Sequence, residues 1–334
     1  MTPRRLRQFL ALIEHAHFGH AAKALGVSQP ALSKSIQLLE QELGVTLFDR
    51  RTDGVTLTAF GQVLQRKSQR LLMAEEDLRR DIALLAVGDI GTLKVALGPY
   101  PSVISGYPAI ARLHARHPHL NVTAHVAGWR EVAHQVASGV VDLGIAEISA
   151  LQGVEEFNCE LLGEHQGRLF CRPGHPLLSQ RSLNRAQTLD YPWVASRIPF
   201  RLAGVLLPAT LGRAGAYDTV TGDFVPAIEI DVPMQIVQFV ANSNALAVGT
   251  LSAFERELLA GEIVPLPLHD QASYTRYGFI SLKERSLPPA VEAFMREVRV
   301  VEEDVARREH ELADLMMKSR KGGPVSARNQ PLCQ

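Results

Sequence analysis

Residues 29–43 are the most sharply bounded segment of the chain. Ser28 is a good N-cap for a helix, Pro30 is tolerated in a first turn, and Gly44 stands where the helix needs a left-handed residue to end. The apolar side chains of the segment fall within one narrow sector of a helical wheel: Leu32, Ile36, Leu39 and Leu43. The pattern predicts a helix with one packing face and one polar face. Apolar residues at helical spacing in 6–13 and 21–25 predict two helices before it.

The polar face of this helix is typical of a nucleic-acid reader. Its side chains are donors and acceptors that suit base edges and phosphates: Gln29, Ser33, Lys34 and Gln37. Two β-prone runs follow around Arg50-Arg51-Thr52-Asp53-Gly54, where Asp-Gly is a strong hairpin signal. They predict a wing whose arginines contact phosphates or a narrow minor groove. The alternative is a three-helix bundle with a solvated outer face, which a polar face alone would favour.

The order of these elements resembles a known DNA-binding domain. Residues 21–61, AAKALGVSQPALSKSIQLLEQELGVTLFDRRTDGVTLTAFG, closely resemble the winged helix-turn-helix of the LysR-type transcriptional regulators, and the strings SQPALS and ELGVTLFDR are highly specific. The resemblance implies a DNA-binding domain over 1–61. It places base and phosphate contacts on Ser28, Gln29, Pro30, Ser33, Lys34, Arg50 and Arg51, and the polar face adds Gln37.

Two departures from the family pattern concern DNA contact. His17-Phe18-Gly19-His20 stands where the family commonly has Gly-Ser-Phe-Thr, so the usual hydroxyl cap of the second helix is missing, which puts phosphate contact by its N-terminus in doubt. Lys34 stands where arginine is commoner. A lysine ammonium is a point charge, so it favours phosphate contact over bidentate reading of guanine.

Residues 58–90 predict a long linker helix. Thr58 is a plausible cap, and no proline interrupts the run up to Gly88. Leucines recur at seven-residue intervals and form a candidate dimerisation seam: Leu64, Leu71, Leu78 and Leu85. Ser68 and Glu75 interrupt the seam, so packing of the helix along its own domain is the alternative. The resemblance favours the seam, because the family's linker helices pair antiparallel in a dimer.

The net charge of zero hides an uneven distribution of charge. Residues 1–72 hold ten Lys and Arg against five Asp and Glu, and residues 73–298 hold 18 against 24. The basic segment is where a polyanion is expected to bind. The sequence has no apolar run long enough for a membrane span, and we expect a cytoplasmic protein with no membrane partner.

Beyond residue 90 the chain alternates between predicted strands and helices. Strands at 91–97, 121–128 and 142–148 alternate with helices, as in βαβ units with a parallel sheet covered on both faces. A second set follows: strands in RLFCR, LDYPWVAS, AIEIDV and NALAVGT, and helices near 205–213 and in PMQIVQFVANS. A last strand at 275–283 and a helix at 289–300 come after them. The fold class is therefore α/β overall.

The family resemblance implies how these units are joined. It predicts an effector-binding domain over 91–300, similar to periplasmic binding proteins, with subdomain I formed by 91–163 and 268–300 and subdomain II by 164–267. Beyond it, 301–334 predict a C-terminal helix, with packing or oligomer contacts by its apolar face, and then a disordered tail.

Ligands of open parallel sheets bind beyond the carboxyl ends of strands, and this rule selects the candidate effector residues. They are Pro101, Ser102, Gly128, Trp129, Glu147, Ser149, Ser196, Arg197, Gly249 and Thr250. Each of them also suits an ordinary turn or cap. Arg197 favours an anionic effector, whereas Glu147 favours hydroxyl or amine groups, so the effector class stays open.

No catalytic or metal site is expected. The chain lacks GxSxG, HExxH and P-loop motifs, and the histidines of HARHPH at 114–119 straddle a helix end and a proline. We expect no enzyme activity, no metal and no cofactor. The sequence predicts a sequence-specific regulator that binds promoter DNA as a homodimer or homotetramer, takes a small-molecule effector and contacts RNA polymerase. The alternative is a small-molecule binding protein whose N-terminal domain serves oligomerisation.

Overall fold

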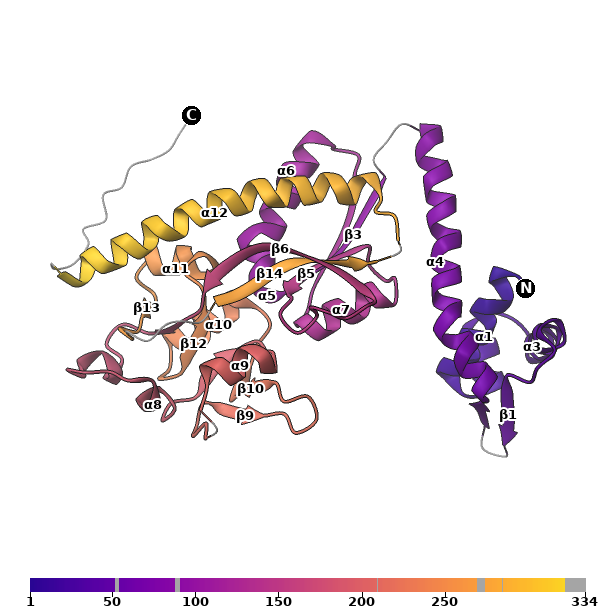
Figure 1. The fold of residues 1–334 in the computed structure, drawn as a ribbon, viewed down its shortest axis with the longest axis horizontal. Helices are drawn as coiled ribbons and strands as arrows, with labels where there is room; N and C mark the ends of the chain where they lie inside the picture. Colours follow the sequence, from indigo (N-terminus) through magenta and orange to yellow (C-terminus); the bar gives the residue numbers. More distant parts are fainter. Residues whose placement is uncertain (52–53, 88–90, 209, 269–273, 284, 322–334) are drawn as a thin grey trace. The chain divides into compact units, whose positions relative to one another are not determined.

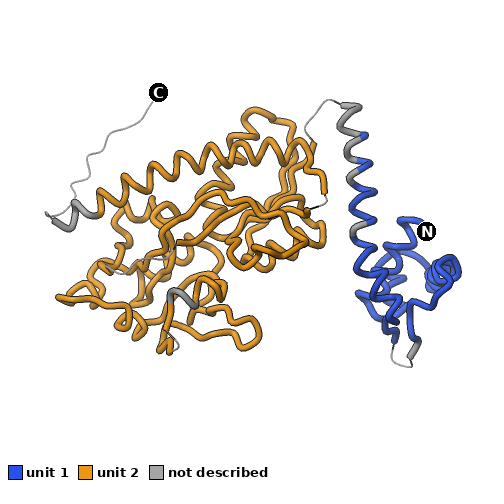
Figure 2. Tube along the Cα trace, viewed as in Figure 1, with its two compact units in different colours: residues 1–89 blue, residues 90–334 orange. Residues whose placement is uncertain are grey.

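The chain forms two compact units, residues 1–89 and 90–334 (Figure 2). The computed structural model describes residues 1–51, 54–87, 91–208, 210–268, 274–283 and 285–321. The predicted tail at 322–334 lies outside these residues. Each unit has its own apolar core, so each is described by itself.

Unit 1 consists of helices and one small hairpin. It comprises α1 (Pro3–His15), α2 (Phe18–Ala24), α3 (Gln29–Leu43), β1 (Phe48–Arg51), β2 (Gly54–Leu57) and α4 (Ala59–Val87), shown in Figure 1. The predicted bounds of α3 are confirmed: the Ser28 hydroxyl accepts a hydrogen bond from the backbone N–H of Ala31 at 3.4 Å, and Gly44 ends the helix at φ 70°. The apolar face of α3 packs with α1 and α2 around Phe9, Leu12 and Ile36.

The hairpin is attached to the helices by polar and close backbone contacts. The Glu40 carboxylate of α3 accepts hydrogen bonds from the backbone N–H groups of Leu47 (2.7 Å) and Phe48 (3.3 Å). The backbone N–H of Val55 donates to the carbonyl of Ala16 at 2.9 Å. A Cβ on Gly61 would lie 2.3 Å from the Leu47 carbonyl, so α4 can approach the hairpin this closely because residue 61 is glycine. The wing is therefore fixed relative to α3.

Unit 2 contains two five-stranded sheets (Figure 1). The first has the order β4 (Asn121–Val126), β3 (Thr92–Leu97), β5 (Leu143–Glu147), β14 (Tyr274–Leu282), β6 (Phe157–Gln166). One face is covered by α6 (Tyr107–Arg116) and α12 (Pro289–Lys321), and the other by α7 (Trp129–Ala137). A short helix, α5 (Pro99–Pro101), and a π-helical turn, η1 (Ser102–Gly106), connect β3 to α6.

The second sheet has the order β11 (Ile228–Glu229), β8 (Trp193–Ala195), β12 (Leu246–Gly249), β7 (Arg168–Cys171), β13 (Val264–Pro265). α10 (Pro233–Ala241), the turn η3 (Ser252–Phe254) and α11 (Glu255–Leu259) pack on one face. α9 (Phe200–Leu206) packs on the other. Three further short elements complete this part of the unit: η2 (Pro176–Ser179), α8 (Arg185–Thr188) and a hairpin of β9 (Gly215–Tyr217) and β10 (Phe224–Pro226).

Both sheets are mixed, so the predicted parallel pairing holds for part of each: β3 runs parallel to β4 and β5, and β8 runs parallel to β11 and β12. β14 runs antiparallel to β5 and β6, and β7 runs antiparallel to β12 and β13. β6 was not predicted from the sequence, because this edge strand has alternating, largely polar side chains, FNCELLGEHQ, and not a continuous apolar run. The predicted helix at 205–213 is also misplaced, since α9 ends at Leu206. The chain passes from the first sheet to the second at Gly167, four residues beyond the predicted limit of 163.

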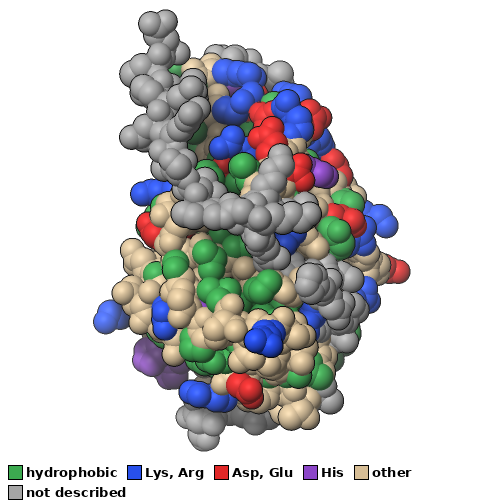
Figure 3. All heavy atoms as spheres, turned by 90° about the vertical axis from the view of Figure 1, so that its left-hand side faces the viewer, with side chains coloured by type: hydrophobic (Ala, Val, Ile, Leu, Met, Phe, Trp, Pro, Cys, Tyr) green, Lys and Arg blue, Asp and Glu red, His purple; other side chains and the backbone are tan. Residues whose placement is uncertain are grey.

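The C-terminal helix α12 contributes to the cores of both parts of unit 2. Val298 and Val301 lie in the core under the first sheet, and Leu312 lies in a core of the second. The helix predicted at 289–300 and the C-terminal helix predicted within 301–334 are thus one helix, which packs along both parts. Figure 3 shows one face of the molecule, on which Lys, Arg, Asp and Glu side chains are intermingled in the upper half.

No helix in the described part of the chain combines the length and the apolar character that a membrane crossing requires.

Candidate functional site

The outer face of α3 keeps its polar side chains accessible. Ser28, Gln29, Pro30, Lys34 and Gln37 are exposed, and Ser33 is half-buried. The opposite face, with Leu32, Ile36 and Leu39, is buried. The backbone of Arg50 and Arg51 belongs to the wing strand β1, but their side chains lie outside what the structure describes. The helix therefore presents a polar surface of the width that a major groove admits.

The second helix has a cap that the sequence reading did not foresee. The Nδ1 atom of His17 accepts a hydrogen bond from the backbone N–H of Gly19 at 3.2 Å, and the His17 ring lies 5.0 Å from that of His20. An imidazole therefore replaces the expected hydroxyl at the N-cap of α2.

The two interpretations of the linker helix apply to different parts of α4. Near its start, Leu64 packs against the core of unit 1 and the buried hydroxyl of Ser68 donates to the Leu64 carbonyl at 2.7 Å. Glu75 is paired with Arg7 of α1 at 2.9 Å. Further along, Leu71, Leu78 and Ile82 are exposed by 46%, 61% and 60%. The side chain of Leu85 lies outside the described residues. The second half of α4 thus presents an uncovered apolar row.

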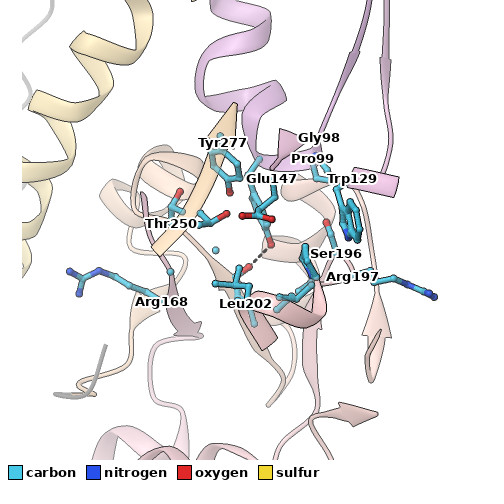
Figure 4. A pocket seen from close by; sticks show the side chains of 18 of the residues that line it. Gly98, Pro99, Trp129, Glu147, Arg168, Ser196, Arg197, Leu202, Thr250 and Tyr277 are labelled. Atoms are coloured by element: carbon cyan, nitrogen blue, oxygen red, sulfur yellow. Dashed lines mark hydrogen bonds between the residues drawn. The ribbon is translucent and has the colours of Figure 1, made fainter. Parts of the chain in front are cut away.

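Unit 2 contains a cavity at the carboxyl ends of its parallel strands (Figure 4). The turn after β3 contributes Gly98 to Pro101, Trp129 begins the helix that follows β4, and Glu147 is the last residue of β5. The second sheet supplies Ser196 and Arg197 after β8, Gly249 at the end of β12, and Thr250 after it. The empty space inside amounts to about 1050 Å³, counting its open mouth. A cavity with mostly apolar walls and a few polar groups is typical of a small-molecule site.

Seven of the ten predicted effector residues line the cavity, and three do not: Ser102, Gly128 and Ser149. The buried Ser102 hydroxyl donates to the Pro99 carbonyl at 2.6 Å, so it serves the turn into η1. Gly128 is the N-cap of α7. The Ser149 hydroxyl donates to the Glu147 carboxylate at 2.7 Å and therefore acts on the cavity through that group.

The aliphatic part of the Arg197 side chain lines the cavity, whereas its guanidinium group does not. Its guanidinium is paired with Asp218 at 3.1 Å and Glu229 at 3.3 Å, and Figure 4 shows it extending away from the cavity. A hydrogen bond with Glu229 raises the pKa of the guanidinium further. The guanidinium of Arg168 also extends away, on the opposite side. Neither group is placed as an anchor for an anion inside the cavity.

Glu147 is a buried carboxyl group in the cavity wall, 7% exposed. Burial raises its pKa, although hydrogen bonds from the Ser149 hydroxyl and from the backbone N–H groups of Arg276 and Ser149 oppose the shift. The neighbouring Arg276 guanidinium is paired with Glu164 at 3.0 Å. Glu147 is therefore held in a fixed position by hydrogen bonds from Ser149 and Arg276.

Several cavity residues were not predicted from the sequence. Tyr277 lies on the antiparallel strand β14, and Trp193 and Leu202 lie on β8 and α9. Tyr100 donates its hydroxyl to the Val248 carbonyl on the facing wall. The rule about strand ends could not select Tyr277 or Trp193, because they lie within strands. An aromatic residue in a strand gives no sequence signal that separates a cavity wall from a core.

Hydrogen bonds at the rim of the cavity join the part of unit 2 around the first sheet to the part around the second sheet. Arg130 of α7 is paired with the fully buried Asp223 at 2.6 Å, and its guanidinium stacks on the Trp129 ring at 4.3 Å. Arg201 of α9 donates to the Ser149 carbonyl at 3.0 Å. With the Tyr100 bond, these contacts hold the two walls together around the cavity.

A buried charged cluster lies beside the cavity, where α12 crosses β6. His165 of β6 lies 3.2 Å from the carboxylates of both Glu302 and Glu309 of α12, and its ring packs against Tyr277. Burial alone would lower its pKa, but hydrogen bonds with Glu302 and Glu309 outweigh burial and raise it to about 9. Glu309 also accepts a hydrogen bond from the backbone N–H of Ser252, whose hydroxyl lies 3.0 Å from that of Thr250. The cluster links α12 to a residue of the cavity wall.

Two family models match most of the chain. Residues 3–62 match the bacterial regulatory helix-turn-helix protein, lysR family, and residues 87–301 match the LysR substrate binding domain. A curated relative, the SDS degradation transcriptional activation protein of Pseudomonas sp. (strain ATCC 19151), is 35% identical over 294 residues, which are 87% of this chain and 93% of the relative.

Solved structures share the fold along most of the chain. Full-length CbnR complexed with its target DNA is 19% identical with a TM-score of 0.56, over 90% of this chain and 100% of that one. Full-length LysG from Corynebacterium glutamicum, with arginine bound as its effector, is 17% identical with a TM-score of 0.57, over 89% and 98%. These likenesses extend across both units.

Proposed function

This chain belongs to the LysR family of transcriptional regulators, and we propose that it reads a promoter site through the exposed face of α3 and responds to a small molecule held in the cavity of unit 2. Members of this family are DNA-binding regulators with an effector-binding domain and are not enzymes. The observation that carries the proposal is that one chain has both an accessible polar helix face, in unit 1, and an apolar cavity, in unit 2. The proposed site of action is the cytoplasm.

On DNA, the proposed contacts divide into two groups. Gln29, Ser33 and Gln37 face base edges in the major groove, where glutamine suits adenine. Contacts to phosphate come from Ser28, Lys34, Arg50 and Arg51, with Pro30 packing at the helix start. The first group sets the preferred sequence, and the second sets most of the affinity and its dependence on salt.

Two half-sites are bound at once if the exposed row on α4 pairs with a second copy of the chain. Leu71 and Leu78 are the centre of this proposed dimerisation seam, with Leu64 and Leu85 at its ends. Pairing makes the second DNA contact intramolecular, which raises the affinity for a two-part site. Further pairing of dimers gives a homotetramer.

Ligand binding is proposed to act through the cavity walls. A molecule between the two sheets changes the hinge between them and so the placement of the winged domains. DNA bending and contact with RNA polymerase change as a result. The coupling is reciprocal, because DNA bound in one arrangement favours the matching ligand state.

Two variants test the proposed roles on DNA. Gln29→Ala should reduce the preference for the intergenic DNA flanking the protein's own gene over random DNA by about tenfold or more, because it removes a base contact worth about 1–3 kcal/mol. Arg51→Ala should weaken binding to both DNAs equally and reduce the slope of log affinity against log salt by about one unit.

The control is Gln238→Ala, which removes an exposed glutamine of unit 2 and should change neither quantity. Equal losses on specific and random DNA for both Gln29→Ala and Arg51→Ala would contradict the assignment of roles. Binding without any sequence preference would favour an oligomerisation role for unit 1.

A further inference from the structure

The polar groups that face into the cavity gather on one side of it. Figure 4 shows Tyr277, Glu147 and Thr250 close together, with Trp129 and Ser196 across the space. Glu147, Tyr277 and Thr250 are 7%, 3% and 1% exposed. The rest of the lining is largely aliphatic and aromatic, with Trp193, Leu202 and several prolines among its members. A ligand therefore meets one polar corner and otherwise apolar walls.

The charge in this corner is negative. Glu147 brings a carboxyl group, and the guanidinium of its neighbour Arg276 is bound to Glu164. A second carboxylate, Asp231, lies outside this corner and outside the cavity lining, beside Gly128, the residue before Trp129, where a Cβ would be 4.0 Å from its Oδ2 atom. The Oδ1 atom of Asp231 is buried and has no hydrogen-bond partner among the described residues.

The arginines of the cavity wall do not offset the Glu147 carboxyl group inside the cavity. Arg197 is paired with Asp218 and Glu229, and Arg168 donates to the Gln166 side chain. Both guanidinium groups extend away from the cavity in Figure 4. Arg185, a third arginine of the wall, also has an interaction partner in the structure. A ligand with a carboxylate or sulfate head would meet Glu147 without a matching cation.

We propose that the effector is an apolar molecule whose polar head donates hydrogen bonds to Glu147, as a hydroxyl or an ammonium group does, and that acids of the same shape are rejected. The inference rests on the proposed function, since it assumes that this cavity is the effector site. The apolar body lies against Trp129, Trp193 and Leu202, where burial of its surface supplies most of the affinity. The head group supplies the selection, because a buried polar site discriminates against a partner that leaves it unpaired or repelled.

The two tryptophans of the chain provide a direct readout. The chain has two tryptophans, Trp129 and Trp193, and both line the cavity. Tryptophan fluorescence excited at a wavelength that phenyl groups do not absorb therefore reports occupancy of the cavity. Three probes with one apolar body separate the head groups: 4-phenylbutan-1-ol, 4-phenylbutylamine and 4-phenylbutanoate. Each is titrated into the full-length protein at constant pH and ionic strength.

The proposal predicts saturable fluorescence changes with the alcohol and the amine, and binding of the acid at least tenfold weaker than the tighter of the two. Binding of the acid more tightly than both would overturn the proposal. The carboxylate would then accept a hydrogen bond from the indole N–H of Trp129, which is buried without a hydrogen-bond partner among the described residues. Absence of a saturable change with either donor at millimolar concentration would overturn it as well.

Glu147→Gln tests the residue itself. The amide keeps the size of the side chain and an acceptor for Ser149, but it turns an NH2 group toward the backbone N–H of Arg276, which loses its acceptor. The variant should therefore unfold a few degrees below the wild type. The amine should bind at least tenfold more weakly, the alcohol should change by less than about threefold, and the acid should gain affinity. Glu155→Gln, at an exposed loop position of the same unit, is the matched control and should change none of the three.

Arg197→Gln tests the opposite assignment. Loss of acid binding in this variant, with the amine unaffected, would show that the guanidinium anchors an anion and would overturn the proposal. Binding to promoter DNA is measured separately on the same wild-type protein. If the wild-type protein binds its promoter DNA specifically but the three probes do not bind as predicted, only the ligand class is rejected. If the wild-type protein does not bind promoter DNA specifically, the proposed function is rejected.

Discussion

The polar side chains of the α3 face and those of the cavity are held in different ways. On α3, Gln29, Lys34 and Gln37 are exposed to solvent. In the cavity, Glu147 and Thr250 are buried and already hydrogen-bonded to neighbouring residues. An accessible set of flexible side chains suits a large polyanion, which can be met from outside. A buried and prearranged set suits a small molecule, because its groups are oriented before the ligand arrives.

The two regions also differ in how they are assembled from the sequence. The α3 face comes from ten consecutive residues, 28–37, and its caps are next to it in the chain. The cavity collects residues from Gly98 to Tyr277, contributed by loops and strands of two sheets. A local surface tolerates changes elsewhere in the fold, whereas the cavity depends on the position of every wall. The predictions below probe this difference.

The largest expected effect comes from a core substitution in unit 1. Phe9 is fully buried and its ring lies 5.2 Å from that of Phe48. Phe9→Ala should destabilise unit 1 by about 3–5 kcal/mol and abolish DNA binding at 37 °C, because the cavity it leaves cannot refill. Both tryptophans lie in unit 2, so the unfolding transition seen by tryptophan fluorescence should not move.

The matched variant is Phe294→Ala, in the core of unit 2, which should move the fluorescence transition and leave the helix–wing fold of unit 1 intact. A fluorescence transition that shifts with Phe9→Ala would show that the two units unfold together.

A pH dependence is expected from the His165 cluster. Because the pKa of His165 is raised to about 9 in the folded protein, its ion pairs contribute fully below the ordinary pKa of 6.5 and are lost as the pH rises through 9. The contribution is on the order of 2–4 kcal/mol. The pKa of Glu309 is lowered: burial would raise it, but hydrogen bonds and charge from His165 outweigh burial. Its contribution is therefore present above its ordinary value and is lost as the pH falls through the lowered pKa.

Denaturant unfolding of the wild type followed by tryptophan fluorescence between pH 6 and 9.5 measures this slope, and His165→Gln should flatten it. A slope that persists in His165→Gln would assign the titration to another group.

Loss of a contact across the cavity rim should have a smaller effect. Arg130→Ala removes the ion pair of the buried Asp223. Asp223 keeps the hydrogen bond that it accepts from the backbone N–H of Phe200 at 3.0 Å. Unit 2 should lose about 1–3 kcal/mol of stability. The emission of Trp129 should change, because the guanidinium no longer covers its ring.

Arg307→Ala serves as the control, since it removes an exposed i,i+3 pair with Asp304 and should cost less than about 1 kcal/mol. Equal stability of Arg130→Ala and the wild type would mean that the rim contact does not hold the walls together.

The smallest expected effect concerns the exposed row on α4. Leu78 is 61% exposed, so Leu78→Ala should change the stability of unit 1 by less than about 0.5 kcal/mol. If the row is a dimer seam, the same change should weaken self-association by about 1–3 kcal/mol for each leucine that is buried in the pair. Sedimentation equilibrium measures the association directly. An unchanged association constant would place the dimer contact elsewhere.

The sequence was a good guide wherever structure is set by neighbouring residues. Ser28 and Gly44 predicted both ends of α3, and the Asp-Gly pair predicted a hairpin whose flanking strands are β1 and β2. Trp129, Glu147 and Thr250, which were selected as effector residues because they lie at strand ends, line the cavity, and their effector role stays a prediction. These signals depend on caps, turns and short runs, which are local properties.

The sequence was a poor guide wherever tertiary packing decides. The pattern of β6 did not reveal its antiparallel pairing with β14, and so the placement of Tyr277 in the cavity was missed. Arg197 follows a strand as expected, but its partners Asp218 and Glu229 come from segments 21 and 32 residues away. The direction in which its charge points could not be read from the chain. The His17 cap was missed because a ring nitrogen is an uncommon N-cap acceptor.

Titration of the full-length protein with the intergenic DNA flanking its own gene, against random competitor DNA at two salt concentrations, measures whether α3 reads sequence. We expect a preference for the flanking DNA of about a thousandfold or more, with a footprint in two half-sites. Equal competition by random DNA at both salt concentrations would contradict it, because the exposed face of α3 would then be contacting DNA without reading its sequence.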